Sequence, residues 1–254
     1  MLQIHNVTKK FGGVYAVDDL SFDVKKGTIH SIIGPNGAGK TTLVNMITGV
    51  YKVDNGTIFL DGSDITNIAT NKLVYRGICR TFQNLEICDN LTVLENVMLG
   101  FDKYMDKSIL KSCFKAKSIL DDEKRYEERA IHLLGLIGLE DFASQKAQNL
   151  SYGILKKLEI IRALATSPEL ILLDEPVAGL NPKETAEVAQ LIKTVVKDEV
   201  TIILIEHDMK MVMQISDYIT VMHFGKKLAQ GTPKEIVHNK AVIEAYLGSG
   251  DMHG

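Results

Sequence analysis

The sequence predicts an α/β protein in which a layered sheet carries an additional helical lobe. Three observations indicate this class. Residues 1–60 contain short β-branched runs separated by turns rich in glycine and aspartate, as sheet does. Charge density rises and strand patterns fade over about residues 91–148, which favours helix. After Ser151, predicted helices alternate with strands expected to be buried, as in sheets whose strands are joined by crossover connections.

Length and composition narrow the class of protein. The 254 residues fit one large domain, or one domain with a sizeable lobe, at roughly 150 residues per domain. Hydrophobic residues make up 45% and charged residues 24%, which excludes disordered, collagen-like and coiled-coil proteins. The formal net charge of −3 lacks the strongly basic character of nucleic-acid-binding proteins, so we expect no nucleic-acid partner.

Cysteine usage and hydropathy bear on the cellular compartment. Cys79, Cys88 and Cys113 form no C-x-x-C pair, so neither a disulfide framework nor a zinc site is expected, and a reducing cytosol is favoured. The amino terminus has no export-signal pattern. No apolar run approaches the roughly 18 residues of a membrane span. We therefore expect a protein that neither spans a membrane nor is exported.

The individual elements follow from hydrophobic periodicity and turn residues. In the first part of the chain we expect strands at Leu2–Thr8, Val17–Val24, Ile29–Ile33, Gly56–Leu60 and Ile78–Phe82, and a helix at Lys40–Ile47. In the lobe, helical spacing relates Tyr126, Ala130, Leu134 and Ile137, and no chemistry is assigned to Asp102–Asp122. After the lobe we expect helix Ile154–Ala165, strand Leu170–Asp174, helix Pro182–Lys197, strand Val200–Ile205, helix Asp208–Ile215 and strand Ile219–Met222.

A glycine-rich loop carries the most specific signal. The stretch Gly34-Pro35-Asn36-Gly37-Ala38-Gly39-Lys40-Thr41 matches the phosphate-binding pattern G-x-x-x-x-G-K-[ST]. Its glycines let backbone N–H groups converge on phosphate oxygens at a helix amino terminus. Lys40 supplies a mobile positive charge for the β- and γ-phosphates, and the Thr41 hydroxyl is available to Mg²⁺. An ordinary glycine turn is the alternative, and the predicted order of strand, loop and helix disfavours it.

A second motif is the apolar strand Leu170–Asp174, which ends in the carboxylates of Asp174 and Glu175. P-loop proteins place an acid beside the phosphate-bound metal in this way. Asp174 then supports Mg²⁺, and Glu175, one residue further, faces an attacking water as general base. The alternative, a buried strand that simply emerges into solvent, is disfavoured behind a phosphate-binding loop.

Three further patches occur in a diagnostic order. Ser151-Tyr152-Gly153 lies at the start of a predicted helix. Gln83 follows the strand-like run Ile78–Phe82, and His207 directly follows the apolar strand Thr201–Glu206. Singly, these are an ordinary helix cap, a surface residue and another cap. Together with the two motifs above, they resemble the ATP-binding subunit of ABC transporters over about residues 1–248.

The resemblance implies a P-loop NTPase (RecA-like) core with an antiparallel β subdomain and an inserted helical lobe. The chain is then a single ABC ATPase domain over 1–254, with its core at about 1–90 and 157–254 and its lobe at about 91–156. It further implies that two copies face each other head to tail with ATP between them, and that the cofactors are ATP and Mg²⁺.

Site residues carried over from the resemblance fall into three groups. The nucleotide-binding group is Phe11, Gly34, Pro35, Asn36, Gly37, Ala38, Gly39, Lys40, Thr41 and Thr42, with Ser151 and Gly153 contributed by the opposite copy. The metal group is Thr41, Gln83 and Asp174, and the catalytic group is Glu175, His207 and Gln83. Phe11 stacks on adenine, His207 hydrogen-bonds the γ-phosphate, and Gln83 also contacts the membrane partner.

Two positions depart from the family pattern, and several point to one branch of it. Ile154 replaces the usual signature glutamine, which implies a weaker nucleotide sandwich, and Asn181 stands where many relatives have aspartate. Stretches such as Arg80-Thr81-Phe82-Gln83 and Glu206-His207-Asp208-Met209 look most like the branched-chain amino-acid uptake branch. The implied partners are a second ATP-binding subunit and transmembrane permease subunits, with the chain peripheral on the inner, cytoplasmic face of the membrane.

Other functions remain as alternatives. A P-loop GTPase requires Asn-Lys-x-Asp, and the nearest match, Asn239-Lys240-Ala241-Val242, lacks the aspartate. A factor acting on ribosomes or DNA usually has two cassettes or a long coiled coil, and the sequence has one cassette and neither extra. The ATPase subunit of a lipid-type exporter, or a P-loop ATPase not coupled to transport, is the closer alternative.

Overall fold

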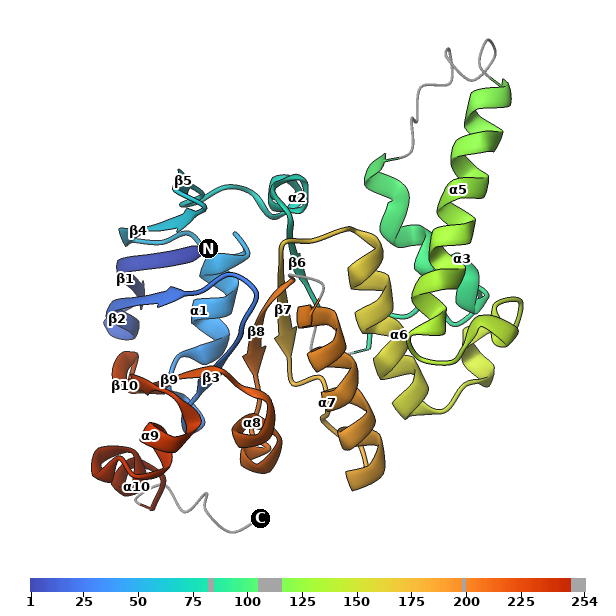
Figure 1. Ribbon diagram of the computed structural model, residues 1–254. Coiled ribbons are helices and arrows are strands. Elements are labelled where there is room, and N and C mark those ends of the chain that lie inside the picture. Colours follow the sequence, from blue (N-terminus) through green and yellow to red (C-terminus); the bar gives the residue numbers. More distant parts are fainter. Residues whose placement is uncertain (82–84, 105–115, 198–199, 248–254) are drawn as a thin grey trace.

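A computed structural model describes residues 1–81, 85–104, 116–197 and 200–247. Within these residues the chain forms two sheets and a group of helices (Figure 1). The first sheet is antiparallel, with strand order β2-β1-β4-β5. Its strands are β1 (Leu2–Phe11), β2 (Val14–Val24), β4 (Asn55–Leu60) and β5 (Ser63–Asp64).

The second sheet has the order β10-β9-β3-β8-β7-β6, and its neighbours from β9 to β6 are parallel. Only β10 joins it antiparallel, as an edge strand in the described part of the chain. Its strands are β3 (Ile29–Ile33), β6 (Ile78–Arg80), β7 (Leu170–Asp174), β8 (Thr201–Ile205), β9 (Tyr218–His223) and β10 (Lys226–Gly231). The order places the carboxyl ends of β3, β8 and β7 side by side at one edge.

Helices cover both faces of this second sheet. The α-helices of the described residues are α1 (Lys40–Ile47), α2 (Thr70–Leu73), α3 (Val93–Met98), α5 (Ala116–Gly135), α6 (Tyr152–Ala165), α7 (Pro182–Lys197), α8 (Met209–Ile215), α9 (Pro233–Val237) and α10 (Lys240–Leu247). In Figure 1, α3, α5 and α6 stand on the side opposite the antiparallel sheet.

Strand β7 shows why these sequences form these layers. All five of its residues are buried, and alternate side chains point to opposite faces. Leu170 and Leu172 pack in the core shared with α1 and the antiparallel sheet, whereas Ile171 and Leu173 pack in the core shared with α6 and α7. A strand covered on both faces is mostly apolar, which explains the uninterrupted hydrophobic run before Asp174.

The helical lobe packs on the second of these cores. Val93, Phe101, Ala130 and Leu134 are buried together with the apolar face of α6. Helix α3 begins with a capping box, in which the Thr92 side chain and the Glu95 side chain bond each other's backbone N–H. None of the helices in the described part of the chain is both long and apolar enough to cross a membrane.

The α/β class and the buried strands predicted from the sequence are confirmed, and two details are corrected. Helix α5 ends at Gly135, so Ile137 lies beyond the helix that was expected to include it. The helix ends there because Gly138 takes a left-handed conformation (φ 65°) and the backbone tightens into a turn after Leu134. Strand β10 was missed because its residues are mostly polar, as an exposed edge allows.

Candidate functional site

The glycine-rich loop joins β3 to α1, in the predicted order of strand, loop and helix. Gly34 (φ 154°) and Gly39 (φ 98°) have backbone conformations that side-chain-bearing residues rarely adopt. A Cβ atom on Gly34 would collide with the carbonyl oxygen of Met222, and one on Gly39 with that of Ala16. Glycine is therefore required at both positions by close backbone packing as well as by conformation.

Lys40 is held inside this loop. Its side chain is buried, and Nζ donates hydrogen bonds to the carbonyl oxygens of Gly34 (2.6 Å) and Pro35 (3.1 Å). The ammonium is tied here to the loop's own carbonyls, because a buried cation needs such acceptors. Thr41 is exposed and Thr42 half-buried in the first turn of α1.

Asp174 lies at the carboxyl end of β7 and is 6% exposed. The Arg80 guanidinium, at the end of neighbouring β6, donates to its Oδ2 at 2.7 Å. The same guanidinium donates to Oδ1 of Asn45 on α1 at 2.7 Å. Arg80 therefore links the acid of β7 to the helix that follows the glycine-rich loop.

Glu175 and His207 form a pair at the ends of adjacent strands. His207 Nε2 lies 2.9 Å from Glu175 Oε1, and both side chains reach solvent, with 47% of His207 and 20% of Glu175 exposed. Glu175 has φ 51°, a left-handed conformation that carries strain for a residue with a side chain. Its N–H donates to the Ile205 carbonyl of β8 at 2.9 Å, which fixes the turn beside His207.

Glu206 lies between these loops, directly before His207, and is 4% exposed. Its Oε1 accepts the N–H of Val177 at 3.0 Å, and its Oε2 accepts the N–H of His207 at 3.0 Å and that of Asp208 at 3.4 Å. Burial raises the pKa of the Glu206 carboxyl above its ordinary value, the three N–H donors oppose this, and the nearby Glu175 charge adds to the rise.

Ser151 and Gly153 lie at the start of α6, whereas the glycine-rich loop precedes α1. Ser151 is the exposed N-cap of this helix. A Cβ on Gly153 would overlap the Glu184 side chain of α7, so glycine is needed there for helix packing. Asn181 caps α7, with its Oδ1 accepting the N–H groups of Lys183 and Glu184 at 3.0 Å each.

Ile154, the departure from the signature pattern, is half-buried and packs against the core beneath α6. Phe11 is 45% exposed at the end of β1, and its ring meets that of Tyr51 edge-on with centroids 5.3 Å apart. Gln83 lies outside the described residues.

The structure thus brings together, at the carboxyl edge of the parallel sheet, the glycine-rich loop, Asp174, and the Glu175–His207 pair. Sequence reasoning missed Arg80 and Glu206, although each carried a signal. Arg80 is a cation within a predicted strand, and Glu206 is a carboxylate that directly follows an apolar strand, as Glu175 nearly does. Neither residue belonged to a sequence motif that specifies its hydrogen-bond partner.

Comparison with known proteins now identifies the family. The ABC transporter family model matches residues 17–178, and a model of the branched-chain amino acid ATP-binding cassette transporter matches residues 226–252. The chain belongs to the ABC transporter family. It is a nucleotide-binding ATPase with the mixed α/β P-loop fold of that family.

Three individual proteins define the similarity further. The high-affinity branched-chain amino acid transport ATP-binding protein BraF of Pseudomonas aeruginosa is 42% identical over 249 residues, covering 98% of both chains. The ADP conformation of MJ1267, an ATP-binding cassette of an ABC transporter, is 36% identical, with 98% of both chains covered and a TM-score of 0.85. The dimeric post-hydrolysis state of the cassette MJ0796 bound to ADP and phosphate is 27% identical, with 92% of this chain and 99% of that chain covered and a TM-score of 0.73.

Proposed function

We propose that this chain is the ATP-hydrolysing subunit of an ABC importer for branched-chain amino acids, and that it energises a membrane permease from the inner face of the membrane. The ATPase assignment rests on the Glu175–His207 pair, whose side chains lie 2.9 Å apart. His207 follows β8, the neighbour of the strand that leads into the glycine-rich loop, and Glu175 follows β7, the next strand along the sheet. The branched-chain cargo rests on the similarity to BraF and on the match over residues 226–252.

ATP binding is assigned to the loop from Gly34 to Thr42. Its backbone N–H groups at the start of α1 suit phosphate oxygens, and the two glycines that admit no Cβ keep the loop closely packed. The Lys40 ammonium exchanges its carbonyl acceptors for phosphate oxygens when the nucleotide arrives. Phe11 provides an exposed aromatic ring for adenine.

The donor atoms at the site fit magnesium. Thr41 offers a hydroxyl and Asp174 a carboxylate, both hard oxygen ligands of the kind that Mg²⁺ prefers. Bound at these residues, Mg²⁺ would supply positive charge to neutralise the nucleotide phosphates. We assign Thr41, Asp174 and Gln83 to hold it, and Arg80, which now pairs with Asp174, to orient that carboxylate.

Hydrolysis is assigned to Glu175 and His207. The Glu175 carboxylate accepts a proton from water while the water oxygen attacks the γ-phosphorus, and the bond to the β-γ bridging oxygen breaks to leave ADP and phosphate. His207 Nε2 lies 2.9 Å from Glu175 Oε1 in this structure, and we assign the imidazole to bond a γ-phosphate oxygen when ATP is present.

A second copy of the chain, or a sister cassette, is proposed to complete each site. Ser151 and Gly153 begin a different helix from the one that follows the phosphate loop. The exposed Ser151 N-cap therefore has hydrogen-bonding capacity to offer to nucleotide bound by the partner. The dimeric form of the cassette MJ0796 supports this arrangement.

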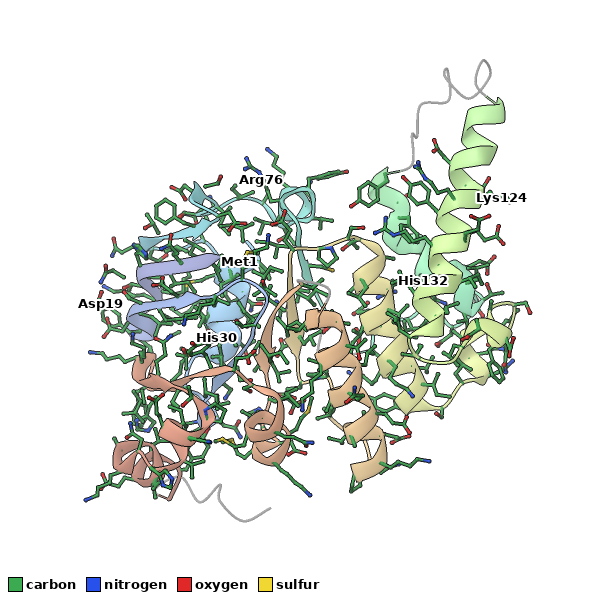
Figure 2. All side chains as sticks on the ribbon, in the orientation of Figure 1. Met1, Asp19, His30, Arg76, Lys124 and His132 are labelled. Carbon is green, nitrogen blue, oxygen red and sulfur yellow. The ribbon has the colours of Figure 1, made fainter. Side chains whose placement is uncertain are left out.

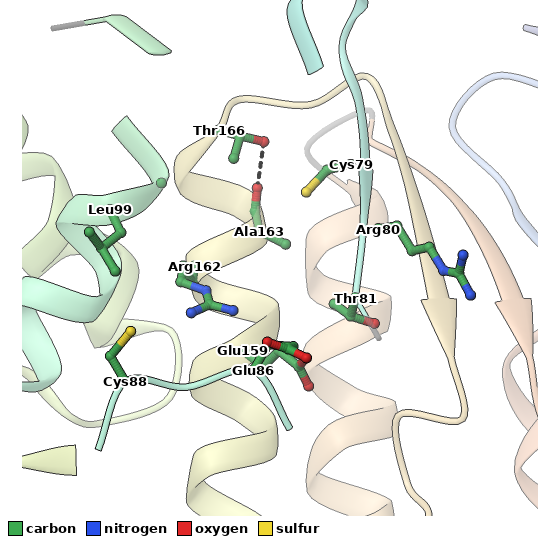
Figure 3. Close-up of a pocket in the computed structure, with 11 residues that line it drawn as sticks. Cys79, Arg80, Thr81, Glu86, Cys88, Leu99, Glu159, Arg162, Ala163 and Thr166 are labelled. Atoms are coloured by element: carbon green, nitrogen blue, oxygen red, sulfur yellow. Dashed lines mark hydrogen bonds between the residues drawn. The ribbon is translucent and has the colours of Figure 1, made fainter. Parts of the chain in front are cut away.

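The permease is proposed to dock at a cavity of about 440 Å³ between the parallel sheet and the helical lobe (Figure 3). Cys79 and Thr81 contribute from the β6 side, and Glu159 and Arg162 contribute from α6. Exposed Leu99 on the short helix Leu99–Tyr104 adds an apolar contact. Thr81, which lines this cavity, lies two residues before Gln83 in the sequence, and we assign Gln83 to sense the permease.

Reconstitution with candidate membrane partners tests this function. We expect the chain to co-purify with branched-chain-type permease subunits, and ATP hydrolysis in vesicles to rise when the matching amino-acid-loaded binding protein is added. Co-purification with the membrane pair of a lipid exporter instead would contradict the importer assignment. ATPase activity that no membrane partner alters would favour an uncoupled P-loop ATPase.

A further inference from the structure

Glu206 is a buried charged group to which the proposed chemistry assigns no role. It follows β8, and 4% of it is exposed to solvent. Burying a carboxylate is costly unless strong hydrogen bonds compensate for the lost water. The hydrogen-bond donors around the Glu206 carboxylate therefore indicate its role.

Its three hydrogen bonds join two separate loops. Oε1 accepts from Val177, two residues after Glu175, at 3.0 Å. Oε2 accepts from His207 at 3.0 Å and from Asp208, the N-cap of α8, at 3.4 Å. The Glu206 carboxylate thus bonds the backbone of both loops that carry the Glu175–His207 pair. Oε1 bonds the loop after β7, and Oε2 bonds the loop after β8.

The loop after β7 needs such an acceptor. Glu175 has a left-handed backbone, and the next residue, Pro176, has no N–H to donate. The N–H of Val177 is consequently the next donor after Glu175 itself, and Glu206 accepts it. With the bond from the Glu175 N–H to the Ile205 carbonyl, this ties the strained turn to the β8 loop at two points.

We propose that Glu206 is a positioning residue for ATP hydrolysis, which fixes the Glu175 turn against His207 so that base and imidazole meet the same γ-phosphate. The inference rests on the proposed roles of Glu175 and His207. A carboxylate suits this task because both of its oxygens accept, whereas the nearly isosteric amide of glutamine presents an NH₂ group to one of the backbone N–H donors. The P-loop contacts of Lys40 involve none of these atoms.

The test is Glu206→Gln in the full-length chain. We expect kcat for ATP to fall about tenfold or more, while KM for ATP changes less than twofold, because only the geometry around Glu175 and His207 is altered. An unchanged kcat in the folded variant would overturn the proposal. So would a rise in KM with kcat preserved, which would place Glu206 in nucleotide binding instead.

A double-mutant cycle with Glu175→Gln separates a positioning role from general structural support. Single-turnover assays with labelled ATP measure the hydrolysis rates of the slow variants. If Glu206 acts through Glu175, its replacement costs little further rate once Glu175 is already glutamine. Equal fold-losses in both backgrounds would overturn the proposal. Glu175→Gln alone tests the proposed base, so failure of that role is distinguishable from failure of the inference.

Asn96→Ala provides the matched control. Asn96 is also fully buried and bonds the backbone of Cys88 and Thr92, but it lies in the helical lobe. Asn96→Ala should lower the melting temperature of the chain without lowering kcat. If it lowers kcat as much as Glu206→Gln does at equal destabilisation, the effect of Glu206→Gln is one of stability. If Glu206→Gln fails to fold, the same cycle with Glu206→Asp, which keeps both acceptor oxygens, decides the question by the same criteria.

Discussion

The Lys40 ammonium lies inside the loop that it is expected to serve, where it bonds two loop carbonyls at 2.6 and 3.1 Å. A motif identifies such a lysine but does not say how its side chain is held before the ligand arrives. The geometry indicates two tasks: the cation closes the loop in the absence of nucleotide, and it neutralises phosphate charge in its presence.

We predict that Lys40→Ala weakens ATP binding at least tenfold, since a hydrogen bond to a charged group contributes roughly 1.5–3 kcal/mol. Isothermal calorimetry measures the affinity directly. The matched control is Lys234→Ala on exposed α9, which should leave ATP affinity unchanged. Equal affinities of Lys40→Ala and the unaltered chain would refute the assigned role.

Ile154 illustrates how packing qualifies a motif comparison. Its side chain lies against the core beneath α6, so a glutamine at this position loses apolar contact and brings an amide to a partly apolar site. We predict that Ile154→Gln lowers the free energy of unfolding by about 1 kcal/mol. Urea denaturation measures this, with Ile154→Val as the apolar control. A Gln variant as stable as the original chain, with tighter ATP-dependent dimerisation, would contradict the prediction.

At the scale of elements, the glycine-rich loop is shaped by its neighbours as much as by its ligand. We predict that Gly39→Ala destabilises the chain and abolishes high-affinity ATP binding, because the new Cβ meets the Ala16 carbonyl oxygen. Thermal unfolding and calorimetry measure the two effects.

Gly138→Ala is the control for backbone conformation alone. Gly138 also has a positive φ (65°), but a Cβ there meets nothing within 4 Å. It should cost only the roughly 1–2 kcal/mol of a left-handed alanine and leave ATP binding intact. If the two alanine variants unfold and bind ATP alike, steric collision is not what requires Gly39.

The sequence predicted elements well where local pattern and burial agree. Strand β7 was found because a strand covered on both faces carries a continuous apolar run, and α7 because Asn181, Pro182 and Glu184 begin it with a cap, a proline and an acid. Strand β10 was missed because an exposed edge tolerates polar residues. Arg80 and Glu206 were missed because their partners, Asp174 and Val177, lie far away in sequence.

At the scale of the whole molecule, His30 makes folding sensitive to acid. It lies in β3 (Figure 2). Its ring stacks on the rings of Phe22 and Tyr218, and its Nε2 lies 2.8 Å from Thr220 Oγ1. Burial lowers the pKa of His30 from 6.5 to about 4. The folded chain thus keeps His30 neutral, whereas the unfolded chain takes up a proton once the pH falls below 6.5.

We predict that the free energy of unfolding falls as the pH drops from 6.5 to 4, with His30 contributing about 3 kcal/mol of the loss at pH 4. Chemical denaturation across this range measures it. His30→Gln removes the titrating group and should flatten that part of the profile, whereas substitution of exposed His238 should not. Parallel losses in the His30→Gln variant and the unaltered chain would rule out His30 as the source.

The central claim is that Glu175, held beside His207, is the base for hydrolysis of ATP bound at the glycine-rich loop. Single-turnover hydrolysis of ATP by the Glu175→Gln variant, with binding measured on the same samples, tests it most directly. We predict retained ATP binding and a hydrolysis rate reduced about 10²–10⁴-fold, the usual contribution of a positioned general base. Hydrolysis at the native rate by a variant that binds ATP normally would contradict the claim.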